Sequence, residues 1–197
     1  MIDIDILLAL GAAYKKVASG AIIFQEGAAA SFYHQLVSGS VRWVNIDDDG
    51  KEFIQNIIEP GECFGEMPLF DGEPFAATAI ADTDAIIIRL HISCFHQLMT
   101  ERPDIHFAFT KLMSQRLRFK FMLLKELTSH DPEQSIISLL HYLKEKKKNI
   151  CAKCNKVNLT RQQIANMTGL RVETVIRTIR NLHDKGQLLI DKGKVYC

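Results

Sequence analysis

The sequence of 197 residues lacks a long uncharged apolar run, and it lacks a basic segment ahead of the apolar stretch Met1–Leu10. The first absence argues against a membrane-spanning helix, and the second argues against a cleavable secretory signal. Because Met1–Leu10 carries Asp3 and Asp5, we interpret it as a helix that docks on the protein's own core. These features predict a soluble, cytoplasmic protein.

Cysteine is also scarce, and the five residues are scattered. They are Cys63, Cys94, Cys151, Cys154 and Cys197. An odd, scattered set argues for a reducing compartment and against a disulfide framework. Cys151 and Cys154 have the spacing of a metal knuckle or a redox pair, and Cys197 or His141 could add a ligand. Plain surface thiols are the favoured interpretation, so no metal site is predicted, while a redox switch and a metal site stay open alternatives.

The chain as a whole is nearly neutral, but its two parts carry large net charges of opposite sign. The net charge is +1, yet residues 133–197 hold 13 Lys and Arg against 5 Asp and Glu, a net of +8. The remaining residues hold 11 against 18, a net of −7. A basic C-terminal part attached to an acidic body is typical of a DNA-binding domain joined to a domain with another task.

Between Tyr14 and Ile92 the sequence consists of short apolar runs separated by glycine-containing turns. Five runs are predicted to be strands: Ala21–Phe24, Tyr33–Val37, Val41–Ile46, Phe53–Ile58 and Ala85–Leu90. Regularly spaced short strands predict a small antiparallel barrel or jelly roll.

A helical period begins after Pro103. The positions of a dimer seam at heptad spacing are Met113, Leu117, Lys120, Leu124 and Leu127, of which Lys120 is polar. The seam is longer than a monomeric core helix needs, so we expect a long helix that pairs with a second copy, with a monomeric helix as the alternative. Asp131 before Pro132 then predicts the cap of a new helix.

The stretch from Leu159 to Asn181 predicts a helix-turn-helix. Thr160 can cap a first helix, and Gly169 supplies the tight turn. In the second helix the apolar positions Val175, Ile176 and Ile179 are expected to face inward. The polar positions expected to face outward are Arg171, Glu173, Thr174, Arg177 and Arg180.

Asp191-Lys192-Gly193 between two short apolar runs predicts a hairpin, the wing, directly after these helices. Arg177 can bind guanine O6 and N7 together, and Glu173, one turn earlier, can accept from the cytosine amino group. The alternative is that the two side chains only pair on a solvated surface, as charges four residues apart often do. The turn glycine and the wing favour the DNA reader.

With these motifs in this order, the chain resembles the cyclic-AMP receptor and fumarate-nitrate regulator (CRP/FNR) family of bacterial transcription factors over nearly its whole length. The quoted motifs are Phe64-Gly-Glu-Met-Pro-Leu-Phe70 and Glu73-Pro-Phe-Ala-Ala-Thr78, which resemble the family's phosphate-binding cassette. The resemblance implies an α+β chain with a cyclic-nucleotide-binding-like β-barrel (jelly roll), a long dimerisation helix and a winged helix-turn-helix. We place their boundaries at residues 1–102, 103–130 and 131–197.

The resemblance implies a homodimer that binds double-stranded DNA, reads bases with Glu173 and Arg177, and works with RNA polymerase. Its implied phosphate contacts are Thr160, Arg161, Gln162 and Thr174, beside which Arg171 also faces outward. Val172 stands where the cyclic-AMP branch has another reading arginine, so the motif resembles the fumarate-nitrate branch more closely. Ile176 departs from that branch as well, where a serine is expected, which leaves the outer base open. The expected target is a palindrome whose half-sites contain TGA.

The effector pocket implied by the resemblance departs further from the family. Its positions here are Gly65, Glu66, Phe75, Ala76, Lys120 and Phe121. Phe75 replaces the arginine that neutralises a cyclic phosphate, so the sequence argues against a cyclic nucleotide. An iron-sulfur cluster is not expected, because Met1–Ala30 contains no cysteine. Haem or an apolar ligand remains open, and the effector is unknown.

The sequence therefore predicts an effector-responsive transcription regulator, with a pivot at Leu127–Asp131. The alternative is a small-molecule (haem or apolar ligand) binding module whose tail is a protein-interaction domain. No Ser-His-Asp arrangement, tuned carboxylate pair or metal-ligand set supports an enzyme.

Overall fold

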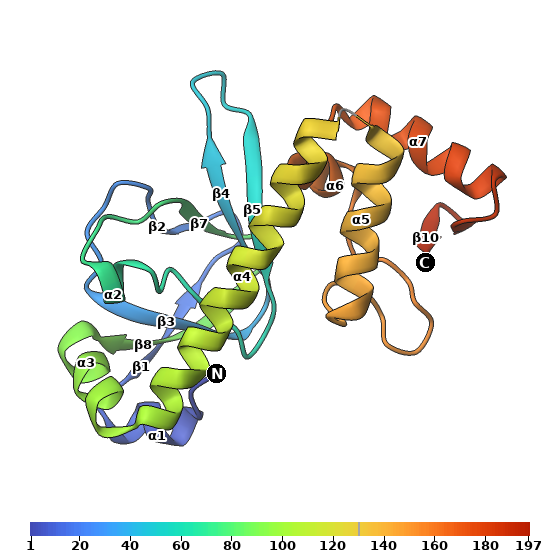
Figure 1. Cartoon of the computed structure of the whole chain (residues 1–197). Coiled ribbons are helices and arrows are strands. Elements are labelled where there is room, and N and C mark those ends of the chain that lie inside the picture. Colours follow the sequence, from blue (N-terminus) through green and yellow to red (C-terminus); the bar gives the residue numbers. More distant parts are fainter. Residues whose placement is uncertain (130) are drawn as a thin grey trace. The chain divides into compact units, whose positions relative to one another are not determined.

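The computed structural model describes residues 1–129 and 131–197, apart from the side chains of residues 127–129. It contains two compact units, Met1–Ser114 and Gln115–Cys197, which are described separately below. The long helix α4 (Pro103–Ser129) contributes to both units (Figure 1). The predicted pivot at Leu127–Asp131 falls partly outside the described residues and stays a prediction. None of the described helices is apolar enough over a sufficient length to cross a membrane.

The N-terminal unit contains two four-stranded antiparallel sheets. The first has the order β1-β8-β3-β6, with β1 Ala13–Val17, β8 Ala85–His91, β3 Phe32–Ser38 and β6 Cys63–Phe64. The second has the order β2-β7-β4-β5, with β2 Ile22–Phe24, β7 Thr78–Ala81, β4 Val41–Ile46 and β5 Glu52–Ile58. The predicted jelly roll is confirmed, although the two sheets do not close into a single barrel.

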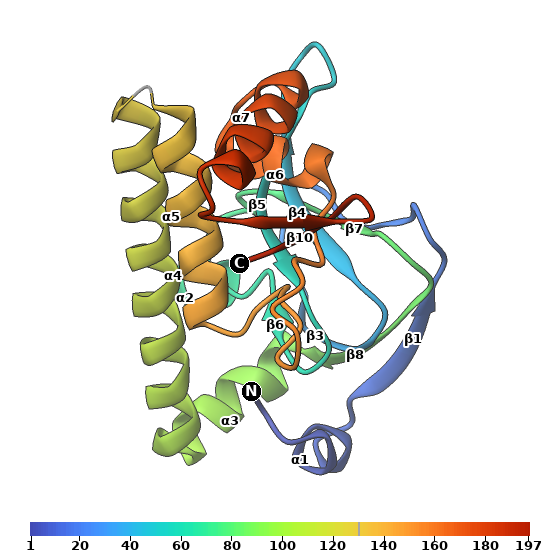
Figure 2. The ribbon, with the colours of Figure 1, turned by 90° about the vertical axis from the view of Figure 1, so that its right-hand side faces the viewer.

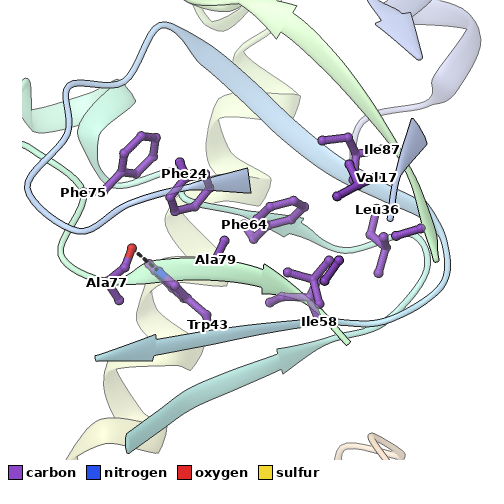
Figure 3. Packing of buried hydrophobic residues seen from close by; sticks show 13 residues of the cluster. Val17, Phe24, Leu36, Trp43, Ile58, Phe64, Phe75, Ala77, Ala79 and Ile87 are labelled. Carbon is purple, nitrogen blue, oxygen red and sulfur yellow. Dashed lines mark hydrogen bonds between the residues drawn. The ribbon is translucent and has the colours of Figure 1, made fainter. Parts of the chain in front are cut away.

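Side chains from both sheets fill the space between them (Figure 3). Leu36 and Ile87 come from the first sheet, and Trp43 and Ile58 come from the second. Because alternate residues of a strand point to opposite faces, each strand can bury one row of side chains here. The indole Nε1 of Trp43 donates a hydrogen bond to the Ala77 carbonyl at 3.2 Å, so the polar atom of this buried ring is satisfied.

A second apolar cluster in this unit brings helices together with strands β3, β6 and β8. The helices are α1 (Ile4–Ala9), α2 (Pro68–Asp71), α3 (Ile92–Glu101) and the start of α4. Asp3 caps α1 by accepting from the Asp5 N–H, and Leu7 of α1 is fully buried. The prediction that the first ten residues form a docking helix is therefore confirmed.

The C-terminal unit contains the end of α4, three further helices and a two-stranded hairpin. These elements are α5 Pro132–Glu145, α6 Arg161–Thr168, α7 Val172–Asp184, β9 Leu189–Asp191 and β10 Lys194–Tyr196. The side chain of Asp131 accepts from the N–H groups of Glu133 and Gln134, as a helix cap should. α5 runs antiparallel beside the last turns of α4 (Figure 2). The rings of Phe119 and Tyr142 stack between these two helices, with their centroids 4.3 Å apart.

The five predicted strands all exist, with ends that differ by no more than one residue. Strands β1, β6 and β7 were not predicted. β1 buries only Val17, so it has no alternating pattern, and β6 is two residues long. β7 is buried along its whole length but is built largely from small residues, which carry little strand signal.

Candidate functional site

The helix-turn-helix is formed by α6, a turn at Gly169 and α7. Thr160 accepts from the Gln163 N–H at 3.0 Å, and the Gln163 side chain accepts from the Thr160 N–H at 2.9 Å, which completes a capping box. Gly169 has φ of 71°, a left-handed conformation that glycine adopts without strain. The local signals at Thr160 and Gly169 therefore fix where α6 begins and ends.

α7 has one buried face and one exposed face. The buried side chains are Val175, Thr178, Ile179 and Leu182. The prediction that Ile176 faces inward is wrong, because this side chain is 36% exposed. Successive helical residues are about 100° apart, so Ile176 turns away from the stripe through Val175 and Ile179, which Thr178 and Leu182 complete.

The exposed face of α7 carries the predicted reading residues. Glu173, Ile176 and Arg177 are all exposed and lie within little more than one helical turn. Arg171 and Arg180 are exposed as well, and Thr174 is half-buried. Among the described residues, no ion pair joins Glu173 to Arg177. Both side chains are therefore available for polar contacts outside the chain.

The N-terminus of α6 and the wing border one groove of about 360 Å³. Its lining includes Thr160 and three cationic side chains, Lys156, Arg161 and Lys194. Partial burial lowers the pKa of Arg161, whose guanidinium nevertheless stays charged at any pH of interest. Gln162 beside it is exposed and donates to Asn166 at 2.7 Å. Backbone N–H groups at a helix start together with cations suit a phosphate group.

The wing turn is built by Lys192 and Gly193, which both have positive φ, 45° and 76°. β9 and β10 pair across it, with Lys194 opposite Asp191. Lys192 and Lys194 are both exposed. An ion pair of 2.6 Å between Lys185 and Glu133 joins the end of α7 to the start of α5.

In the N-terminal unit, the predicted effector residues fall into a buried group and an exposed one. Gly65, Glu66 and Phe75 are buried, with Phe75 only 4% exposed, whereas Ala76 is exposed. The ring of Phe75 stacks on Phe24 with centroids 3.8 Å apart and planes 8° apart (Figure 3). Phe75 therefore belongs to the hydrophobic core.

The two rings pack tightly against the cassette glycine. A Cβ atom added to Gly65 would lie 2.5 Å from Phe24 Cζ and 2.9 Å from Phe75 Cε1. Gly65 has φ of 66°, so a side chain is disfavoured there on both counts. The position at which the resemblance implies an arginine thus holds a buried ring without charge, and it does not fit a cyclic phosphate.

Sequence reasoning missed Phe24 and His34, which pack beside the cassette. The His34 ring lies 5.4 Å from Phe24 and 5.6 Å from Phe64. Burial, followed by the charges of Arg89 and Lys15, lowers the pKa of His34 to about 3. No sequence signal marks these partners, because Phe24 and Phe75 are far apart along the chain.

The long helix carries the remaining predicted residues. In the C-terminal unit, Leu117, Phe121 and Leu124 are 55%, 62% and 58% exposed, and Lys120 is half-buried. Burial, followed by the charge of Arg116, lowers the pKa of Lys120 to about 8. Met113, in the N-terminal unit, is half-buried, and the Leu127 side chain lies outside the described residues.

Another cavity of the N-terminal unit, about 260 Å³, lies between α2 and α4. Its lining includes Met67, Phe70, His106, Phe109 and Met113. His106 is the only histidine in this lining, and the sequence pattern did not single it out. Within the described residues, no group of three or more His, Cys, Asp or Glu side chains is arranged to hold a metal ion.

Comparisons with known proteins agree with this two-part organisation. Residues 14–102 match the cyclic nucleotide-binding domain family, and residues 134–196 match the Crp-like helix-turn-helix domain family. The cAMP-activated global transcriptional regulator CRP of Salmonella typhimurium is 28% identical over 181 residues, which cover 91% of this chain and 86% of that protein. The CRP-like cAMP-activated global transcriptional regulator of Mycobacterium tuberculosis is 24% identical over 178 residues, 89% of this chain and 80% of that protein.

Solved structures share the fold. The c-di-GMP responsive global regulator CLP of Xanthomonas campestris is similar with a TM-score of 0.78 and 22% identity, covering 98% of this chain and 96% of that chain. FixK2 of Bradyrhizobium japonicum is similar with a TM-score of 0.78 and 21% identity, covering 94% of this chain and 91% of that chain.

Proposed function

Because the chain belongs to the CRP/FNR family of transcription regulators, which bind DNA through a helix-turn-helix and are not enzymes, we propose that it acts as a homodimer on a TGA-containing palindrome. Glu173 and Arg177 read the bases, and an effector other than cyclic AMP controls the dimer. The observation that carries this proposal is the exposed face of α7, which presents Glu173, Ile176 and Arg177 opposite the buried face of the same helix.

Base reading follows from the chemistry of this face. The Arg177 fork binds O6 and N7 of the half-site guanine, and Glu173 accepts from the amino group of a cytosine. Ile176 has no polar atom, so its natural partner in the major groove is a thymine methyl group. Guanine, cytosine and thymine contacts on one helical face agree with a TGA step read on both strands.

Phosphate contacts hold α7 in register. Thr160, Arg161 and Gln162 stand at the start of α6, and Arg171 and Thr174 stand at the start of α7. The cationic groove between α6 and the wing adds Lys156 and Lys194 to this surface. Such contacts position the protein without reading sequence, and they make affinity depend steeply on salt.

Dimerisation is supported by the exposed apolar side chains of α4. Leu117, Phe121 and Leu124 follow each other at helical spacing and are all more than half exposed. Burying such side chains against a second copy of the same helix is favourable, and it places two reading helices about one turn of DNA apart. We keep the domain boundaries proposed from the sequence, residues 1–102, 103–130 and 131–197.

The effector assignment rests on Phe75. The curated relatives are named cAMP-activated, but their ligand needs a cation that the buried Phe24–Phe75 stack does not offer. An apolar ligand or haem remains in keeping with the aromatic surroundings. We propose no step that passes through a cyclic nucleotide.

DNA binding is tested by fluorescence anisotropy with a labelled TGA palindrome and a scrambled duplex at several salt concentrations. The proposal expects tighter binding to the palindrome, and a log affinity that falls linearly with log salt. A chain whose tail is a protein-interaction module would bind neither duplex with a steep salt slope, and that result would overturn the proposal.

A further inference from the structure

The loop between α5 and α6 forms a tight turn that brings two cysteines together. The Cys151 N–H donates to the Lys156 carbonyl at 2.8 Å, and the Asn155 N–H donates to the Cys151 carbonyl at 2.9 Å. The chain therefore reverses direction between Cys151 and Lys156, and Asn155, with φ of 57°, lies in the left-handed region at the end of this turn. The thiol of Cys154 thereby comes within hydrogen-bond reach of the Cys151 sulfur.

The environment of Cys151 favours its thiolate. Hydrogen bonds lower the pKa of Cys151, first the one from the Cys154 thiol and then those from the N–H groups of Lys153 and Cys154. The positive charge of Lys156 acts in the same direction. The thiolate is the nucleophilic form of cysteine, so these donors favour reaction at Cys151.

Two of the other thiols differ from this pair, whereas Cys94 in the N-terminal unit is half-buried, as Cys151 is. Cys63 is buried, and burial raises the pKa of Cys197. Cys151 is half-buried and Cys154 is exposed, so reagents can reach the pair. Cys197 Sγ lies 3.9 Å from the Asn155 carbonyl, and Cys197 shares with Cys154 the lining of a surface pocket of about 500 Å³. Cys197 is therefore a neighbouring thiol that could compete with Cys151 for a disulfide to Cys154, and the test below distinguishes the two pairings.

We propose that Cys151 and Cys154 form a redox-active dithiol that is oxidised by small-molecule disulfides of the glutathione type. The Cys151 thiolate attacks one sulfur of the disulfide, whose S–S bond breaks and releases one thiolate. Cys154 then loses its proton and attacks Cys151 Sγ, which forms the internal disulfide and releases the second thiolate. Two protein thiols are oxidised, the reagent is reduced to two thiols, and the two protons pass to the released thiolates.

The dithiol lies at the base of the wing. The Val157 N–H donates to the Val195 carbonyl at 2.8 Å, and the Cys197 N–H donates to the Asn155 carbonyl at 3.2 Å. Both bonds connect the loop directly to β10 or to the residue that follows it. The chemistry does not depend on DNA binding, so it can be tested apart from the proposed function.

The test uses the folded full chain in mixtures of oxidised and reduced glutathione, with free thiols trapped by N-ethylmaleimide and located by peptide mass. We expect the Cys151 and Cys154 thiols to disappear together, with the internal disulfide as product. In Cys197→Ser, the glutathione ratio at which half of the pair is oxidised should be unchanged. In Cys151→Ser and in Cys154→Ser, the remaining thiol of the pair should stop at a glutathione adduct. Stable adducts on the unmodified chain, or a bridge from Cys154 to Cys197, would overturn it.

A rate measurement separates thiolate stabilisation from simple exposure. At pH 7, iodoacetamide should modify half-buried Cys151 several-fold faster than exposed Cys154. Cys154→Ala, which removes the thiol donor from an exposed position, should slow the reaction of Cys151. Faster reaction of Cys154, or an unchanged Cys151 rate in this variant, would show that the donors do not activate Cys151.

Discussion

The C-terminal unit exposes the charged side chains of its helix-turn-helix, whereas the N-terminal unit buries the aromatic side chain of its cassette. Glu173 and Arg177 lie exposed on α7, on a scaffold held by buried Val175 and Ile179. In the cassette, by contrast, the ring of Phe75 is buried against Phe24. The helix-turn-helix thus keeps charged groups available for a ligand, whereas the cassette of the N-terminal unit uses an uncharged ring for core packing.

The largest expected effect concerns the outward-facing apolar residues of α4. Leu117→Ala combined with Leu124→Ala should weaken dimerisation by roughly 4 to 8 kcal/mol, because four leucines lose burial when two copies are counted. Analytical ultracentrifugation measures the dimer dissociation constant. The neighbouring pair Arg118→Ala with Lys125→Ala is the matched control and should change it far less. If both variants changed the dissociation constant equally, this face of α4 would not be the dimer interface.

The inward-facing ring is tested by Phe75→Ala. Removing a ring that is 4% exposed should lower the free energy of unfolding by about 3 to 5 kcal/mol, since a cavity remains beside Phe24. Denaturant unfolding followed by circular dichroism gives this value. Phe70→Ala, at a ring that is 42% exposed, should cost less. A loss below about 1 kcal/mol for Phe75→Ala would mean that the ring is dispensable for packing.

The outward-facing charge is tested by Arg177→Ala. Loss of a bidentate guanine contact should cost about 1 to 3 kcal/mol on the palindrome and relax the preference at that guanine. Binding to duplexes substituted base by base measures both effects. Arg180→Ala, one turn further along α7, should weaken all duplexes alike or not at all. If Arg177→Ala also weakened every duplex equally, Arg177 would be a phosphate contact.

The most gradual effect is a pH dependence of the stability of the N-terminal unit. His34 has a pKa of about 3 when folded and 6.5 in its ordinary state, so below pH 6.5 the unfolded chain binds a proton that the folded chain does not. The contribution of His34 to stability is therefore complete above pH 6.5 and falls by about 1.4 kcal/mol per pH unit towards pH 3. Urea unfolding between pH 7 and pH 5 should show a steeper loss for the native chain than for His34→Gln. Parallel curves would argue that His34 is solvated.

The local parts of both regions could be predicted from the sequence, because local signals determine them. Thr160 and Gly169 set the ends of α6, and the alternating run Val41–Ile46 became β4 without change. The face of Ile176 was predicted wrongly, because an apolar residue was taken to be buried, whereas helical geometry assigns the stripe to Thr178 and Leu182. The stacking of Phe24 on Phe75 could not be predicted, since it joins β2 to the loop before β7, and these two segments meet only when the chain folds.

The central claim is a DNA reader whose effector is not a cyclic nucleotide. The most direct measurement is the dissociation constant for the TGA palindrome and for a scrambled duplex, each taken with and without saturating cyclic AMP on one preparation. The account predicts a palindrome preference that cyclic AMP leaves unchanged, because the buried Phe75 offers the phosphate no cation. An increase of about tenfold or more in palindrome affinity on adding cyclic AMP would contradict it.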